Sequence, residues 1–183
     1  MRLCLLPLTA AALLLATVSA HAVTRGTVVR DPNGIRQSVV RVESSRGELC
    51  SGTLITPTVV LTAAHCLQQR AAYRVVAVDR AFRQRAVMAV AGTLHPAFVP
   101  GTTPRTQPGV DLALLKLAQP LRGDFAPLNP RSAAPVGSGQ PVELAGFGSV
   151  DESASRSARV LRQTQLVSLG TVQVANQIGR AHV

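Results

Sequence analysis

The residue types that could do chemistry gather in one short stretch, Cys50 to Cys66, which reads CSGTLITPTVVLTAAHC. His65 stands directly before the second cysteine, and histidine is the side chain best suited to act as a general acid and base near neutral pH. A disulfide between Cys50 and Cys66 would close a short loop, would stabilise the fold by about 3 kcal/mol, and would hold His65 in place. On these residues alone, His65 is either a catalytic group or a buried structural histidine beside a stabilising disulfide.

A carboxylate is the second group that this chemistry needs, because it fixes the tautomer of the histidine and stabilises the imidazolium. Asp111 begins the apolar segment DLALLKL, residues 111–117. The alternative is an aspartate that simply ends a turn after Pro108 and Gly109, which is a common arrangement. Taken alone, the segment is compatible with both interpretations.

Short apolar segments separated by turn residues must position these side chains. They predict strands over residues 38–44, 51–55, 59–63, 73–78, 86–95, 112–117 and 141–148. The sequence has no long amphipathic helix, and closing a sheet protects its edges, so an antiparallel barrel or sandwich is expected. A proline-rich stretch, residues 119–135, separates the earlier strands from the later ones.

The start of the chain is typical of a secretory signal peptide, with Arg2, an apolar run through Leu15 and an Ala-x-Ala ending at Ala22. Cleavage after Ala22 would make Val23 the new N-terminus and would remove Cys4. Cys50 and Cys66 would then remain as a pair where disulfides persist. The sequence therefore predicts a secreted or periplasmic protein, with no membrane association once residues 1–22 are removed.

Composition gives little support to a nucleic-acid binder. The net charge is +10, but the arginines are scattered without a run, only Lys116 is a lysine, and aromatic residues make up 3% of the chain. Stacking partners for bases are therefore scarce, and no nucleic-acid partner is expected. The length after signal removal suits one domain.

The two motifs together resemble those of the chymotrypsin and trypsin-like serine peptidases. In that family a cysteine opens a strand of small residues, and Leu-Thr-Ala-Ala-His-Cys closes the motif, as residues 61–66 do here. The segment from Asp111 to Leu117 resembles the family's aspartate motif. The resemblance identifies the chain as a secreted, bacterial-type member in which His65 is the general base and acid and Asp111 orients it.

The resemblance also implies the fold, the substrates and the boundaries. The expected fold is all-β, with two six-stranded antiparallel Greek-key barrels, of which the first is complete and the second incomplete. Substrates would be proteins or peptides, no cofactor or metal is required, and a monomer is expected. Residues 23–183 would form the peptidase domain, with the first barrel at 23–120, a connection at 121–136 and a partial second barrel at 137–176.

Weaker similarities extend the resemblance toward the C-terminus. Gly146 to Gly148 resembles a corner at the start of the second barrel, and residues 160–169 resemble the strand that follows. His95, in LHPAF, is interpreted as surface structure.

The family's serine turn, Gly-Asp-Ser-Gly-Gly, is not present in the sequence. Ser138 lacks an acidic neighbour, and neither Ser149 nor Ser168 has the flanking glycines on both sides. Residues 177–183 can be back-translated into a sequencing adapter, so we expect a fragment whose own sequence stops near Asn176. This fragment is expected to be inactive as written. The alternative for this ending is a chance match. The alternative function is a catalytically inactive homologue that acts as a binding protein.

Overall fold

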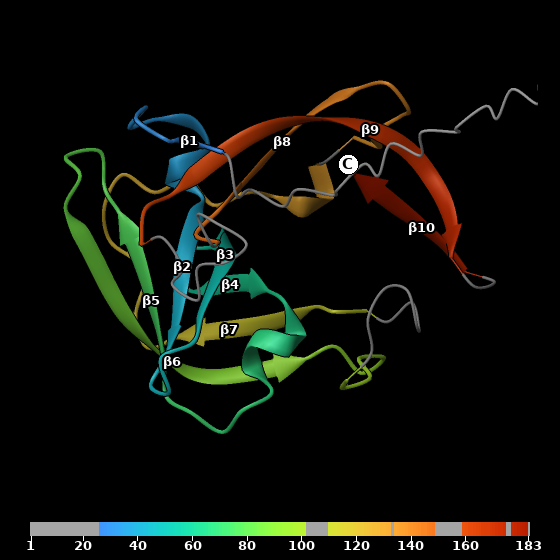
Figure 1. Ribbon diagram of the computed structural model, residues 1–183. Helices are drawn as coiled ribbons and strands as arrows, with labels where there is room; N and C mark the ends of the chain where they lie inside the picture. The colour runs from blue at the N-terminus through green and yellow to red at the C-terminus, as the bar shows by residue number, and fades with distance from the viewer. Residues whose placement is uncertain (1–25, 102–109, 133, 149–158, 175–176, 183) are drawn as a thin grey trace, which may run out of the picture.

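The computed structural model describes residues 26–101, 110–132, 134–148, 159–174 and 177–182 (Figure 1). The expected signal peptide, residues 1–22, and Val23 lie outside the described residues. The strands are β1 Thr27–Val28, β2 Val39–Ser44, β3 Leu49–Thr56, β4 Val59–Thr62, β5 Tyr73–Val78, β6 Gln84–Leu94, β7 Ala113–Leu117, β8 Pro141–Gly146, β9 Arg162–Val174 and β10 Gln177–His182. Within these ranges, three short 3-10 helices join the strands: η2 Gly34–Gln37, η3 Ala64–Leu67 and η4 Pro130–Ser132.

Six strands close into one antiparallel barrel in the order β2-β3-β4-β7-β6-β5 (Figure 1). The strands are rich in valine, leucine and threonine, which suit a pleated surface with one buried face. Strand β7 alternates buried and exposed residues along its whole length, as a strand with one face on a core should. The complete first barrel expected from the sequence is confirmed.

The barrel encloses a core of branched aliphatic side chains. Val40, Val60, Val75 and Leu115 are completely buried at its centre, and Leu54 is 1% exposed. Burying side chains of this size stabilises the fold by about 1.5–3 kcal/mol each. Within the described residues, no helix combines the length and the apolar character needed to cross a membrane.

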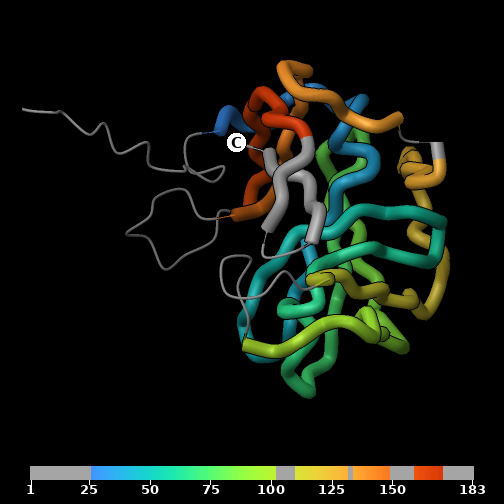
Figure 2. Tube along the Cα trace, turned by 90° about the vertical axis from the view of Figure 1, so that its right-hand side faces the viewer, coloured from blue at the N-terminus to red at the C-terminus, as the bar shows by residue number. Residues whose placement is uncertain are grey.

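A second, incomplete sheet is built on the long strand β9. Strands β1 and β8 both pair with the first part of β9, and β10 pairs with its second part, all antiparallel. Strand β1 lies within the range 23–120 expected for the first barrel, yet it belongs to this second sheet. Strand β10 covers residues 177–182, the segment expected to be an adapter artefact. In Figure 2 strand β8 and the first part of β9, drawn in orange and red, lie above the barrel.

Side chains from the barrel reach across to the second sheet at Phe147, which is 3% exposed. The Phe147 N–H donates a hydrogen bond to Ser51 Oγ on β3 at 2.8 Å. The Arg41 guanidinium lies 5.7 Å from the centroid of the Phe147 ring and donates to the carbonyl of Arg159 at 2.9 Å. These contacts fix the residues after β8 and before β9 against β2 and β3.

Glu43 on β2 carries a buried negative charge that holds two arginines. Its carboxylate accepts hydrogen bonds from Arg41, which is 3% exposed, and from Arg74 on the neighbouring strand β5. Burial raises the pKa of Glu43, but the hydrogen bonds and charges of Arg74 and Arg41 lower it more, so the net pKa lies below its ordinary value. The ionised carboxylate therefore stabilises the folded state.

We predict that Glu43→Gln lowers the free energy of unfolding at pH 7 by about 3 kcal/mol, because it leaves the Arg41 charge buried without its partner. A carboxyl whose pKa is lowered by folding contributes stability above its unfolded pKa, about 4.3. That contribution is lost as the pH falls through the folded pKa. The variant should therefore lose stability less steeply than the wild type as the pH falls below about 4.3. Urea unfolding at a series of pH values measures both effects.

The matched control is Glu143→Gln, because Glu143 is an exposed carboxylate on β8. This substitution should change stability by no more than about 0.5 kcal/mol. An equal loss in both variants would contradict a special role for Glu43.

Candidate active site

The pairing of β4 with β7 brings the two predicted site residues to one end of the barrel. Thr62, the last residue of β4, is opposite Ala113, the first residue of β7. Because the strands are antiparallel, the chain that leaves β4 and the chain that enters β7 lie at the same edge. His65 lies just after Thr62 and Asp111 lies just before Ala113, so their backbones meet there.

The short helix η3 turns the histidine outward. Ala64 is fully buried and Cys66 is 7% exposed, so the residues on both sides of His65 point into the protein. The His65 side chain between them is 60% exposed. Burial of both neighbours leaves the His65 side chain facing solvent.

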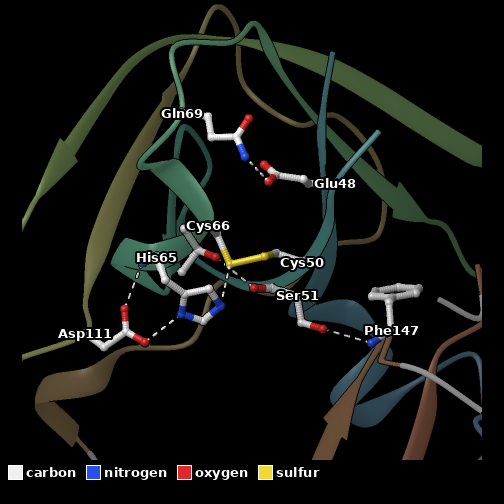
Figure 3. The surroundings of a disulfide bond; sticks show 9 residues. Glu48, Cys50, Ser51, His65, Cys66, Gln69, Asp111 and Phe147 are labelled. Carbon is white, nitrogen blue, oxygen red and sulfur yellow. Dashed lines mark hydrogen bonds and ion pairs between the residues drawn. A yellow bond between two sulfur atoms is a disulfide. The ribbon is translucent and has the colours of Figure 1, made fainter. Parts of the chain in front are cut away.

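His65 and Asp111 make two hydrogen bonds with each other (Figure 3). The ring nitrogen Nδ1 lies 2.7 Å from Asp111 Oδ2, and the His65 backbone N–H donates to Oδ1 at 2.9 Å. An ionised carboxylate can only accept, so Nδ1 carries the proton and Nε2 keeps its lone pair. The arrangement is that of a base oriented by a carboxylate.

The charge on Asp111 is favoured by the same contacts. Partial burial raises the pKa of the Asp111 carboxyl, but hydrogen bonds from the His65 ring and backbone lower it, and the net pKa lies below its ordinary value. Asp111 is therefore ionised at neutral pH and can stabilise a protonated His65.

The disulfide lies directly beside the histidine. Cys50 on β3 and Cys66 in η3 are joined, with their Cα atoms 6.3 Å apart (Figure 3). Cys66 Sγ lies 3.4 Å from His65 Nε2. The bond ties η3 to β3, so the helix that carries His65 is attached to the barrel at two places.

Strands β3 and β4, which carry Cys50 and lead into η3, pack closely against each other. A Cβ atom on Gly52 would lie 2.6 Å from Val60 Cγ1, so only glycine allows the two strands to approach this closely. Thr62 Oγ1 donates to the Ser51 carbonyl at 2.8 Å, from the residue next to Cys50.

Ser51 is a positioning residue that the sequence analysis missed. Its hydroxyl accepts the Phe147 N–H, and a Cβ atom on Gly146 would lie 2.8 Å from that hydroxyl. Ser51 thus links the strand under His65 to the second sheet. The sequence shows that Ser51 follows Cys50, but its partner Phe147 is 96 residues away. No local sequence pattern predicts a hydrogen bond between residues so far apart.

The other serines considered in the sequence, and His95, do not belong to this histidine–aspartate pair. Ser168 is 1% exposed and its hydroxyl accepts the Gly170 N–H, so it is not available as a nucleophile in this conformation. Ser138 lies in an exposed turn before β8 and packs near Gly170. Ser149 lies outside the described residues. His95 is exposed and its Nδ1 accepts the Ala97 N–H at 3.1 Å, as expected for surface structure.

A closed six-stranded barrel, a second antiparallel sheet packed against it and a histidine–aspartate pair at the barrel edge are together typical of the two-barrel serine peptidases. The chain belongs to the trypsin family, because the family model described as Trypsin matches residues 25–182.

Individual relatives agree with this assignment. Chymotrypsin-like elastase family member 1 of Homo sapiens is 31% identical over 137 residues, which cover 70% of this chain and 52% of that protein. Granzyme M of Homo sapiens is 32% identical over 152 residues, which cover 74% of this chain and 53% of that protein. The structure of mouse neuropsin, a serine protease expressed in the limbic system, has a TM-score of 0.63 at 20% identity, covers 79% of this chain and 64% of its own, and shows the fold alone.

The chain spans about half the length of the curated relatives it matches. These relatives are animal proteins, so they do not support the bacterial-type assignment expected from the sequence.

We predict that neutral His65 is protonated on Nδ1, because the Asp111 carboxylate can only accept a hydrogen bond. The ¹⁵N chemical shifts of the ring nitrogens, measured above the titration range of the histidine, distinguish the two tautomers. Asp111→Asn should increase the Nε2-protonated form of His65. His95 is an internal control: its Nδ1 accepts a backbone N–H, so it should be protonated on Nε2 in both proteins. An unchanged His65 spectrum in Asp111→Asn would contradict the assigned hydrogen bond.

Removing the disulfide by the double substitution Cys50→Ser and Cys66→Ser should lower the free energy of unfolding by about 3 kcal/mol. The two cysteines are 16 residues apart, and the unfolded chain regains the entropy of that loop. Chemical denaturation of the oxidised wild type and the variant measures the difference. Cys4→Ser, which changes the cysteine outside this pair, should leave the stability unchanged.

Proposed function

We propose that the chain is part of a secreted serine endopeptidase that hydrolyses peptide bonds through an acyl-enzyme. The observation that carries the proposal is the 2.7 Å contact between His65 Nδ1 and Asp111 Oδ2 at the barrel edge. The family assignment supports it. The activity is proposed, and not assigned, because the chain spans about half the length of its relatives.

The two residues have distinct roles in this mechanism. Asp111 keeps the proton on Nδ1, so the Nε2 lone pair can accept the proton of an attacking hydroxyl. The imidazolium that forms is stabilised by the carboxylate and then gives its proton to the leaving amine. Water then attacks the acyl-enzyme, and His65 carries out the same two proton transfers. In this mechanism His65 only accepts and returns protons, and Asp111 orients it.

The nucleophile is proposed to be a serine encoded beyond the 183 residues. The sequence contains no Gly-Asp-Ser-Gly-Gly turn, and the matched relatives extend further. Without the hydroxyl, His65 has no proton to accept from a nucleophile, so the chain as written would be inactive. In this proposal residues 177–183 are replaced by authentic sequence.

Location and substrate follow from the proposed class. Residues 1–22 are proposed to direct secretion or export to the periplasm, and Val23 to become the N-terminus. The disulfide is compatible with such a compartment. Substrates are proposed to be proteins or peptides, because the acyl-transfer chemistry acts on amide bonds.

Sequencing the gene past the codon for Asn176 and expressing the complete protein tests the proposal. We expect a serine turn in the added sequence and peptidase activity in the product. His65→Ala should lower kcat/KM by about 10⁴ to 10⁶-fold, because the nucleophile loses its general base. The unfolding midpoint should stay close to that of the wild type, because the His65 side chain is largely exposed.

His95→Ala is the matched control and should leave kcat/KM within about twofold of the wild type, because an exposed histidine outside the acid–base pair takes no part in catalysis. A complete gene with glycine or alanine at the serine position would overturn the peptidase proposal. It would favour the alternative, an inactive homologue that acts as a binding protein. Loss of folding in His65→Ala would favour a structural histidine.

A further inference from the structure

Three potential metal-ligand atoms lie together at the edge of the barrel. The sulfur atoms of Cys50 and Cys66 and a ring nitrogen of His65 are all within 4.8 Å of one another (Figure 3). In the oxidised protein the two sulfurs are bonded to each other and cannot act as thiolates. The cluster therefore depends on the redox state of the disulfide.

The distances suit a zinc ion once the disulfide is open. Zinc binds thiolate at about 2.3 Å and imidazole at about 2.0–2.1 Å in tetrahedral geometry, which places a sulfur and a nitrogen ligand about 3.6 Å apart. Cys66 Sγ and His65 Nε2 are already 3.4 Å apart. Two thiolate ligands of one zinc ion lie about 3.8 Å apart. Rotation of the Cys50 or Cys66 side chain can reach that spacing with the Cα atoms 6.3 Å apart.

Asp111 provides the support that zinc-binding histidines usually have. A histidine that binds zinc through one nitrogen typically donates its other N–H to a carboxylate, which fixes the ring and raises its basicity. Asp111 Oδ2 accepts from Nδ1 at 2.7 Å, and this leaves the Nε2 lone pair directed toward Cys66. The carboxylate partner that a zinc-binding His65 would need is thus already in place.

The backbone can hold the three ligands without a large rearrangement. Cys50 lies in β3 opposite Val42 of β2, so the sheet fixes its position. The Cys66 N–H donates to the Ala63 carbonyl at 3.2 Å, which keeps η3 in place. His65 is 60% exposed, so solvent can occupy a fourth coordination position.

We propose that reduction of the Cys50–Cys66 disulfide creates a zinc site formed by Cys50, Cys66 and His65, with water as the fourth ligand. A dithiol supplies two electrons and two protons, breaks the S–S bond and becomes a disulfide itself. The two thiols then lose their protons as thiolates bind the ion. Oxidation and metal binding exclude each other, because both use the same sulfurs.

Zinc binding would also occupy the lone pair that a general base needs. His65 Nε2 cannot bind the ion and accept a proton at the same time. The reduced, zinc-bound protein would therefore be inhibited, and this consequence alone depends on the proposed peptidase function. Metal binding itself is independent of that function and is measured without activity.

The test uses the 183-residue chain with Cys4→Ser, so that Cys50 and Cys66 are the only cysteines. The protein is reduced with a phosphine in water, which supplies the oxygen of the phosphine oxide and the two thiol protons. It is then titrated with Co²⁺ as a spectroscopic probe. We expect one equivalent to bind, with sulfur-to-metal charge transfer and the intense visible bands of tetrahedral Co²⁺, and Zn²⁺ to displace it. The oxidised protein should show none of these bands.

Variants separate this site from nonspecific binding by free thiols. Cys50→Ser and Cys66→Ser should each abolish the charge-transfer band or weaken binding at least 100-fold, and His65→Ala should weaken it at least tenfold. Asp111→Asn should weaken it about 10-fold to 100-fold. His95→Ala should have no effect, and binding should be lost in urea, where the unfolded chain no longer brings the ligands together. Equal affinity in His65→Ala and wild type, binding by the oxidised chain, or no stoichiometric binding by the reduced chain would each overturn the proposal.

Discussion

The register between β4 and β7 is the constraint on which the candidate site depends. Thr62 opposite Ala113 places His65 and Asp111 at one barrel edge. Leu115 and Leu117 point into the core while Leu114 is 42% exposed, so a shift of one residue would expose the core leucines. The apolar pattern of β7 therefore fixes the register, and the register brings the backbones of Asp111 and His65 together.

The disulfide adds a second constraint, because pairing alone does not set the direction of a side chain that follows a strand. Cys66 is bonded to Cys50 on β3, and β3 is hydrogen-bonded through Ser51 to Phe147 of the second sheet. The helix η3 is thus tied to both halves of the structure. A nucleophile contributed by the second half would be placed relative to His65 through this chain of contacts.

Two carboxylates of this protein differ in their burial and in the partners of their charge. Glu43 is nearly buried between Arg41 and Arg74, and its charge serves the packing of the barrel. The Asp111 side chain is 46% exposed, and its charge is directed at a single exposed histidine. Both have a lowered pKa, but the partners of Glu43 are two arginines, whereas the partner of Asp111 is an exposed histidine.

The sequence by itself determined the strands and the two motifs, because period-two patterns, turn residues and the spacing of Leu-Thr-Ala-Ala-His-Cys are local properties of the chain. The strand pattern predicted an antiparallel barrel or sandwich, and the resemblance carried by the two motifs implied the complete first barrel. Only the tertiary structure placed β1 on β9, joined Ser51 to Phe147 and put a buried Glu43 between two arginines. Each of these arrangements joins residues that are far apart in sequence. Barrel closure brings Glu43 beside Arg74, whereas the pairing of the second sheet and its packing on the barrel bring the other residues together.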